Sequence, residues 1–133
     1  MGRRAVLLLD THTWAWSLDR DARLSEAARR AMAPGRGLVL SPVSLYEITQ
    51  KANLGKWPEM EPHLGRLTDL LGRTRVRVAG LTPEVAIRAG LLDWPHRDPF
   101  DRIIAATAQV MGLPLVSKDP AFDSVPGGLH RVW

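Results

Sequence analysis

The sequence predicts an α/β fold built around a mainly parallel sheet. Residues Ala5–Leu9 form an unbroken apolar run, which is typical of a strand covered on both faces. Further short apolar segments alternate along the chain with segments of helical periodicity. No internal repeat, low-complexity tract or change of composition marks a linker. Alternation of strands and helices is the pattern of parallel α/β proteins.

The first half of the chain begins with this buried strand. The start MGRRAVLLLD has the basic pair of a signal peptide, but its apolar core is short and an acid follows it, so we expect a strand. Ser25 is an expected N-cap, and the dipeptide Ser41-Pro42 is typical of a helix start. The segments expected here are helices at Trp14–Leu18 and Ser25–Met32, a strand at Leu38–Leu40, and a helix from Ser41 to Leu54 that stops at Gly55.

The second half continues the alternation. Thr82 and Asp98 each precede a proline and are expected helix caps, and DWPHRDP between these helices is expected to be a loop. The expected segments are a helix at Glu61–Leu71, a strand at Arg75–Ala79, a helix from Thr82 to Leu92, a helix at Pro99–Met111, and strands at Leu113–Ser117 and Leu129–Trp133.

Composition narrows the functional classes. With 133 residues, 45% of them hydrophobic and 24% charged, we expect a single globular domain over residues 1–133. The absence of cysteine excludes disulfides, Cys-based zinc sites and thiol catalysis, and is compatible with a cytoplasmic protein. No uncharged apolar run approaches the ~20 residues of a membrane span, so no membrane is expected. The net charge of +4, mostly from arginine, indicates either an anionic substrate or a solubilising surface.

Four acidic residues lie at the margins of the predicted elements. Asp10 and Asp119 follow predicted strands. Asp101 and Glu47 lie in the first halves of predicted helices. Because strand ends and the starts of the following helices meet at one edge of a parallel sheet, all four carboxylates are expected there.

Such a cluster requires a positive charge. Two unit charges ~4 Å apart repel by about 4 kcal/mol at an effective dielectric constant of 20. Either some of the acids are protonated or a cation lies between them, and carboxylate oxygens favour Mg²⁺ or Mn²⁺. A bound cation of this kind activates water and neutralises phosphoryl charge, which predicts phosphodiester hydrolysis. Thr11 and Ser117 are candidates for neutral ligands or for orienting water.

Each acid also has a structural alternative. Asp10 is placed to cap the following helix, and Asp119 precedes a proline and is placed to start a turn. Asp101 lies in a first helical turn, where the helix dipole favours an acid. Glu47 completes a capping-box pattern with Ser44 and also forms an i,i+4 pair with Lys51.

Two further side chains near Asp101 are candidates for substrate contacts. His96, in the loop before the acidic helix start, is placed to touch substrate or is a plain loop residue. Arg102 is either a phosphate contact or a salt-bridge partner. The four histidines show no zinc-protease spacing, which argues against a zinc hydrolase.

The motifs LLLDTHTWAW, SPVSLYEI, HRDPFDRIIAATAQ and LPLVSKDPAF, in this order, resemble the PIN domain of VapC-type toxins over essentially the whole chain. The resemblance implies a three-layer α/β/α sandwich and Mg²⁺- or Mn²⁺-dependent endoribonuclease activity. It also implies that the acids of the site, for catalysis and metal binding, are Asp10, Glu47, Asp101 and Asp119, with the hydroxyls of Thr11 and Ser117 beside them. No acid of the pattern is missing, although the fourth, Asp119, is the least uniform in such families.

The resemblance further implies an RNA substrate, a cognate antitoxin protein whose tail lies across the acidic groove, and a homodimer. Hydrophobic residues around Trp57 or in Leu64–Leu71 are candidate contacts with these partners.

Other functional classes remain open at this level. A phosphatase of the haloacid dehalogenase type normally has an acid two residues after the first aspartate, where this chain has His12. A receiver-like module has its phosphoacceptor after a later strand and an acidic pair near the start, whereas Asp10 stands alone. A non-catalytic RNA-binding module explains the basic charge but not the clustered carboxylates.

Overall fold

A five-stranded sheet forms the centre of the protein in this computed structural model, which describes residues 6–133. Its strands are β1 (Val6–Leu9), β2 (Gly37–Leu40), β3 (Val76–Val78), β4 (Leu115–Val116) and β5 (Arg131–Val132), in the order β3-β2-β1-β4-β5. All four pairings are parallel, and Leu9 lies opposite both Leu40 and Val116. The parallel sheet is therefore confirmed, while Ala5, the predicted start of the first strand, lies outside the described residues.

The helices begin largely where the sequence predicts. They are α1 (Thr11–Leu18), α2 (Glu26–Ala31), α3 (Pro42–Asn53), α4 (Leu67–Arg73), α5 (Pro83–Leu91) and α6 (Pro99–Met111), with 3₁₀ helices η1 (Pro58–Arg66) and η2 (Pro120–Ser124). The predicted caps Ser25, Ser41, Thr82 and Asp98 each accept a hydrogen bond from a backbone N–H of the first turn. None of these helices in residues 6–133 is long and apolar enough to cross a membrane.

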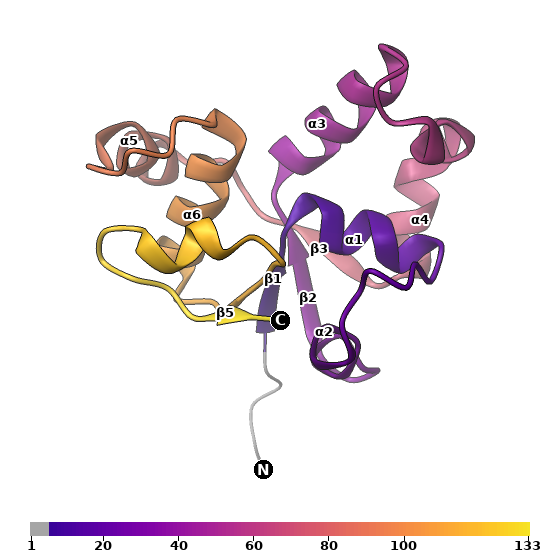
Figure 1. Cartoon of the computed structure of the whole chain (residues 1–133), viewed down its shortest axis with the longest axis horizontal. Coiled ribbons are helices and arrows are strands. Elements are labelled where there is room, and N and C mark those ends of the chain that lie inside the picture. The colour runs from indigo at the N-terminus through magenta and orange to yellow at the C-terminus, as the bar shows by residue number, and fades with distance from the viewer. Residues whose placement is uncertain (1–5) are drawn as a thin grey trace.

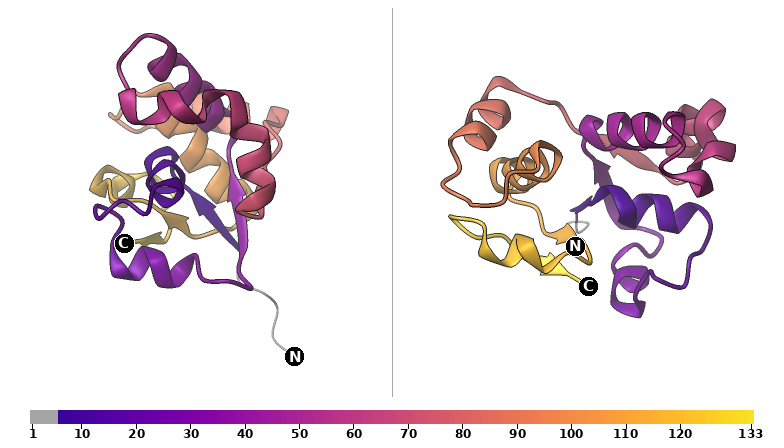
Figure 2. Two further views of the ribbon diagram at one scale, coloured as in Figure 1. Left: turned by 90° about the vertical axis from the view of Figure 1, so that its right-hand side faces the viewer. Right: turned by 45° about the horizontal axis from the view of Figure 1, so that its top comes forward.

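The two faces of the sheet are covered by different helices. Leu7, Leu9 and Leu40 pack into a core that includes Trp14 and Ile48 of α1 and α3. On the opposite face, Leu8, Val39 and Leu115 pack against Ile104 and its neighbours in α6, and against Phe122 of η2. Figures 1 and 2 show α5 and α6 on one side of the strands and α1 to α4 on the other. The three-layer sandwich is thereby confirmed.

The differences from prediction have local causes. The predicted helix Glu61–Leu71 is instead the 3₁₀ helix η1 followed by α4, because Pro62 lies inside the segment and cannot donate a backbone hydrogen bond. The first helix starts at Thr11 rather than Trp14, because Asp10 caps it. The last two strands are shorter than predicted, at two residues each.

The side chains predicted to contact partners, Trp57 and those of Leu64–Leu71, are packed against the core. Trp57 and Leu67 are buried, and Leu64, Leu70 and Leu71 pack against the same core. These side chains stabilise the fold and are not an exposed apolar surface.

The strand order determines where a site can form. From β1 the chain proceeds to β2 and β3 on one side, and it returns to place β4 and β5 on the other side of β1. The direction of winding therefore reverses between β1 and β4, which is where open parallel sheets bind ligands. Asp10 directly follows β1, and Ser117 directly follows β4.

Candidate metal centre

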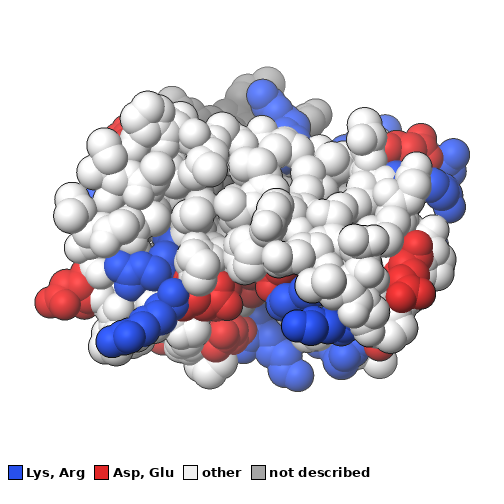
Figure 3. Space-filling model, turned by 90° about the horizontal axis from the view of Figure 1, so that it is seen from above, with Lys and Arg blue, Asp and Glu red and all other residues white. Residues whose placement is uncertain are grey.

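All four predicted acids line one cleft at this edge of the sheet. The cleft has a volume of about 470 Å³, and its lining residues are Asp10, His12, Trp16, Glu47, Lys51, Asp98, Asp101, Lys118, Asp119 and Pro120. Seen from above, acidic side chains gather in the lower middle of the molecule and basic side chains lie on both sides of them (Figure 3). Four segments that are distant in the sequence therefore bring their acids to one cleft, as expected.

Asp10 is held by two hydrogen bonds at the end of β1. Its Oδ1 accepts a hydrogen bond from the backbone N–H of Thr11 at 2.8 Å, and its Oδ2 accepts one from the hydroxyl of Ser117 at 2.7 Å. Asp10 is only 9% exposed, and this burial raises its pKa although both hydrogen bonds act in the opposite direction. Asp10 is thus both the cap of α1 and a carboxylate of the cleft, so the two interpretations of it are compatible.

The two predicted hydroxyl groups have different surroundings. Ser117 links two acids, because its Oγ donates to Asp10 and accepts from the backbone N–H of Asp119 at 3.1 Å. Thr11 is fully buried beneath the cleft, and its Oγ1 donates to Ser44 Oγ of α3 at 2.8 Å. The Thr11 side chain is not among the residues that line the cleft, and its hydroxyl joins α1 to α3. Its role as a ligand or in orienting water stays a prediction.

Glu47 projects inward from the middle of α3. The helix begins at Pro42 with Ser41 as its cap, so the capping-box interpretation of Ser44 and Glu47 is wrong. The predicted i,i+4 pair is confirmed, with Lys51 Nζ 2.5 Å from Glu47 Oε2. Glu47 is 6% exposed, and Lys51, which also lines the cleft, supplies a positive charge that compensates its burial.

Asp101 and Asp119 of the cleft form a close group with His96. Asp101 Oδ2 lies 2.6 Å from His96 Nε2, and one ligand atom of each of the three residues lies within 4.8 Å of the others. Burial raises the pKa of Asp101 to about 6, with a smaller contribution from the charge of Asp10, while the hydrogen bond from His96 opposes the rise. Asp119 also caps η2 through Ala121 N at 2.9 Å.

Arg102 has a structural role that was not predicted. Its guanidinium donates hydrogen bonds to the backbone carbonyls of Ala89, Leu92, Trp94 and His96. Within residues 6–133 these carbonyls, and not a carboxylate, are its partners, so the salt-bridge alternative is wrong. The phosphate contact stays a prediction. The guanidinium fastens the loop that carries His96 to the helix that carries Asp101.

Replacing Arg102 by Met is expected to lower the free energy of unfolding by about 2–4 kcal/mol, because it removes charge-assisted hydrogen bonds and leaves carbonyls unpaired. Urea unfolding followed by circular dichroism measures the change. Arg97→Met is the matched control, since Arg97 is exposed in the loop before α6. Equal stability of the two variants would show that the carbonyl contacts of Arg102 contribute nothing.

Several lining residues were not predicted as part of the site. They are His12, Trp16, Lys51, Asp98 and Lys118. His12 and Trp16 are four residues apart on α1 and follow Asp10, so helical spacing places them on the same face. That spacing is a signal the sequence contains, whereas the contact of His12 with Trp57 at a ring-centroid distance of 4.5 Å depends on the tertiary fold.

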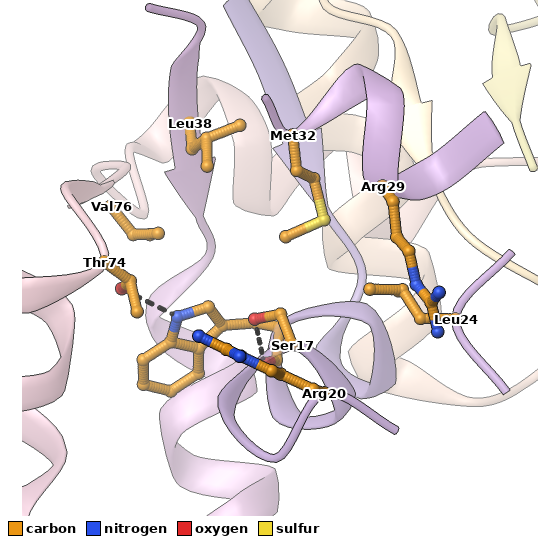
Figure 4. Close-up of a pocket in the computed structure, with 9 residues that line it drawn as sticks. Ser17, Arg20, Leu24, Arg29, Met32, Leu38, Thr74 and Val76 are labelled. Atoms are coloured by element: carbon orange, nitrogen blue, oxygen red, sulfur yellow. Dashed lines mark hydrogen bonds between the residues drawn. The ribbon is translucent and has the colours of Figure 1, made fainter. Parts of the chain in front are cut away.

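Another cavity, drawn in Figure 4, shares no lining residue with the acidic cleft. It measures about 430 Å³ and is lined by Trp14, Ser17, Arg20, Leu24, Arg29, Met32, Leu38, Thr74 and Val76. Trp14 Nε1 donates to Thr74 Oγ1 at 3.1 Å inside it. Because no carboxylate lines it, metal-dependent chemistry is not placed there.

The donor set of the acidic cleft fits a hard divalent cation. Five carboxylates and the imidazole of His12 line the cleft, and His96 lies beside Asp101 and Asp119. Oxygen-rich sets of this kind suit Mg²⁺ or Mn²⁺. Asp10 and Glu47 are buried more deeply than Asp101 and Asp119. Among the residues that line the cleft, Lys51 and Lys118 supply positive charge that partly compensates the acids.

Fold and site define an α/β protein with an acidic centre at the carboxyl edge of a parallel sheet. The model of the PIN domain family matches residues 7–128. Over 116 residues the sequence is 36% identical to Ribonuclease VapC22 of Mycobacterium tuberculosis, covering 86% of this chain and 87% of the relative. The chain therefore belongs to the PIN-domain family, in its VapC-type branch.

Solved structures show the same fold. The crystal structure of VapBC2 from Rickettsia felis, bound to a promoter DNA fragment, matches with a TM-score of 0.71 and 16% identity over 96% of this chain and 99% of that one. A toxin–antitoxin complex from Klebsiella pneumoniae matches with a TM-score of 0.66 and 22% identity over 92% and 95% of the two chains.

Proposed function

We propose that this protein is a toxin endoribonuclease that hydrolyses RNA phosphodiester bonds with Mg²⁺ or Mn²⁺. The observation that carries the proposal is the meeting of Asp10, Glu47, Asp101 and Asp119 in one cleft at the switch point of the sheet. The VapC22 relative is itself named a ribonuclease, which supports the same activity.

Each side chain of the site has a separate task in this proposal. The four acids hold the ion, which when bound neutralises phosphoryl charge and lowers the pKa of a bound water. Ser117 fixes the orientation of Asp10, and His96 fixes that of Asp101. Lys51 and Lys118 lie at the cleft, where they attract the phosphates of the substrate.

The alternatives have less support. A phosphatase of the haloacid dehalogenase type needs a second acid two residues after Asp10, and this chain has His12 there. A receiver-like module is disfavoured by membership of the PIN-domain family over most of the chain. A purely RNA-binding module does not account for four carboxylates that would repel phosphates without an ion.

The proposal extends to two protein partners. The related complexes from Rickettsia felis and Klebsiella pneumoniae are described as VapBC and toxin–antitoxin complexes, which supports a cognate antitoxin for this chain. We propose a homodimer as well. Its candidate surface is the exposed apolar side chains of Leu81, Ile87 and Leu91 at and before α5, and light scattering of the purified protein tests it.

Removal of divalent metal is expected to abolish cleavage of RNA by the purified protein. A structured RNA is incubated with Mg²⁺ or Mn²⁺, then with EDTA, and the products are separated on a denaturing gel. Cleavage should disappear in EDTA and return when either ion is added in excess, because the acids cannot activate water by themselves. Cleavage that persists unchanged in EDTA would contradict the metal-dependent mechanism.

A further inference from the structure

One side of the acidic cleft is built from aromatic and basic side chains. We refer to this group as the aromatic wall; it consists of His12, Trp16, Trp57, Arg23, Lys51 and Lys118. Of these, His12, Trp16, Lys51 and Lys118 line the cleft directly. The wall therefore borders the space in which the four acids meet.

The rings of the wall are held in fixed positions by one another. The His12 imidazole stacks on Trp57 with a centroid distance of 4.5 Å and an interplanar angle of 28°. Trp16 is tilted by 59° against the same imidazole at 5.5 Å. Trp57 is buried while His12 is exposed, so one face of the imidazole rests on Trp57 and the ring is open to the cleft.

Cations surround these rings. Arg23 Cζ lies 4.9 Å and Lys118 Nζ 5.8 Å from the centroid of the Trp16 ring, and Lys51 Nζ lies 6.0 Å from that of Trp57. Each distance is within the range of cation–π attraction. Two cations lie near the Trp16 ring, whereas the imidazole of His12 is exposed and lines the cleft, so His12 offers aromatic surface to a ligand.

Flat aromatic faces interleaved with basic groups suit single-stranded nucleic acid. Bases stack on aromatic rings, including imidazole, while Lys and Arg contact the backbone. In a duplex the bases are already stacked and paired, so this surface offers more to an unpaired base.

We propose that the aromatic wall binds an unpaired nucleobase next to the phosphodiester that is cleaved, with the base stacked on His12 and its phosphate near Lys118. The inference rests on the proposed function and adds a base-stacking residue to its site. Because His12 lies two residues after Asp10, a base stacked on it is adjacent to the metal centre.

The test measures RNA affinity in an Asp10→Asn background, so that RNA is not consumed. Fluorescence anisotropy with labelled oligouridine should show that His12→Ala weakens binding about tenfold, equivalent to about 1.4 kcal/mol and within the range of base–aromatic stacking. His12→Phe, which keeps a flat ring, should restore affinity. His130→Ala is the matched control, because His130 is exposed outside the cleft. A blunt RNA duplex should bind with the same affinity to both alanine variants.

Photocross-linking provides a second measurement that does not depend on the stability of any variant. Oligouridine containing 5-iodouridine should cross-link to the peptide that carries His12 and Trp16. Equal affinity of His12→Ala and His130→Ala for oligouridine, or cross-links only outside the cleft, would overturn the inference and leave the wall as a surface for a protein partner. If the wild type fails to cleave RNA but His12→Ala still loses affinity, the proposed function fails while the inferred site stands.

Discussion

Replacing Asp10 by Asn is expected to reduce RNA cleavage on the order of 10³-fold. Asn keeps the size of the side chain and an oxygen that can cap α1, but it removes the negative charge that faces the cleft. The Lewis-acid contribution of a bound ion amounts to several kcal/mol, and each ~1.4 kcal/mol changes a rate tenfold. Initial rates of cleavage at saturating Mg²⁺ or Mn²⁺ measure the effect, and circular dichroism checks that the variant is folded.

Asp123→Asn is the matched control for this variant. Asp123 is exposed and pairs with Arg131 outside the cleft, with 2.9 Å between Nε and Oδ1. Its replacement should leave the cleavage rate close to that of the wild type. If Asp10→Asn cleaves RNA as fast as Asp123→Asn does, Asp10 is only a helix cap and the assignment of the metal centre is wrong.

The second large effect concerns stability in the absence of metal. The pKa of Asp101 is raised to about 6 by burial, so the folded protein binds this proton more tightly than the unfolded chain does. The resulting stability is fully present below the unfolded pKa of 3.8 and is lost as the pH rises through about 6. A shift of this size corresponds to about 2–3 kcal/mol at neutral pH.

Asp101→Asn is therefore expected to be more stable than the wild type by about 2–3 kcal/mol in EDTA at neutral pH, and equally stable near pH 4. Comparison of the two proteins cancels the other titrating groups, among them His12, whose lowered pKa acts in the opposite direction. Urea unfolding at a series of pH values gives the difference. Excess Mg²⁺ or Mn²⁺ should reverse the order at neutral pH, because only the wild type keeps the full set of ligands. A difference that does not change with pH would refute this account of the Asp101 environment.

The fold and the position of the four acids could be predicted because helix caps and apolar strands are visible in the sequence and agree with the observed topology. Ser25, Ser41 and Asp98 cap helices as their side chains suggest, and the apolar strands place Asp10 and Asp119 at one edge of the sheet. The extent of the short strands and the 3₁₀ conformation of η1 could not be predicted, because tertiary packing and Pro62 determine them.

The roles of single polar side chains were harder to predict than the position of the site. Thr11 and Arg102 are neighbours of acids in the sequence, yet Ser44 takes one hydroxyl and backbone carbonyls take the guanidinium. Trp57 is far from His12 along the chain, so the aromatic wall becomes visible only when α1 and the segment after α3 are seen together.

The four carbonyl contacts of Arg102 should keep the distance between His96 and Asp101 constant when the protein fluctuates. Arg102 and Asp101 are adjacent on α6, and the carbonyl of His96 is one of those that the guanidinium holds. Any tilt of this helix therefore carries the histidine along with the aspartate. The imidazole and the carboxylate should drift as a unit on warming and retain their mutual distance, whereas Glu47, on a separate helix, is free to change its distance from both.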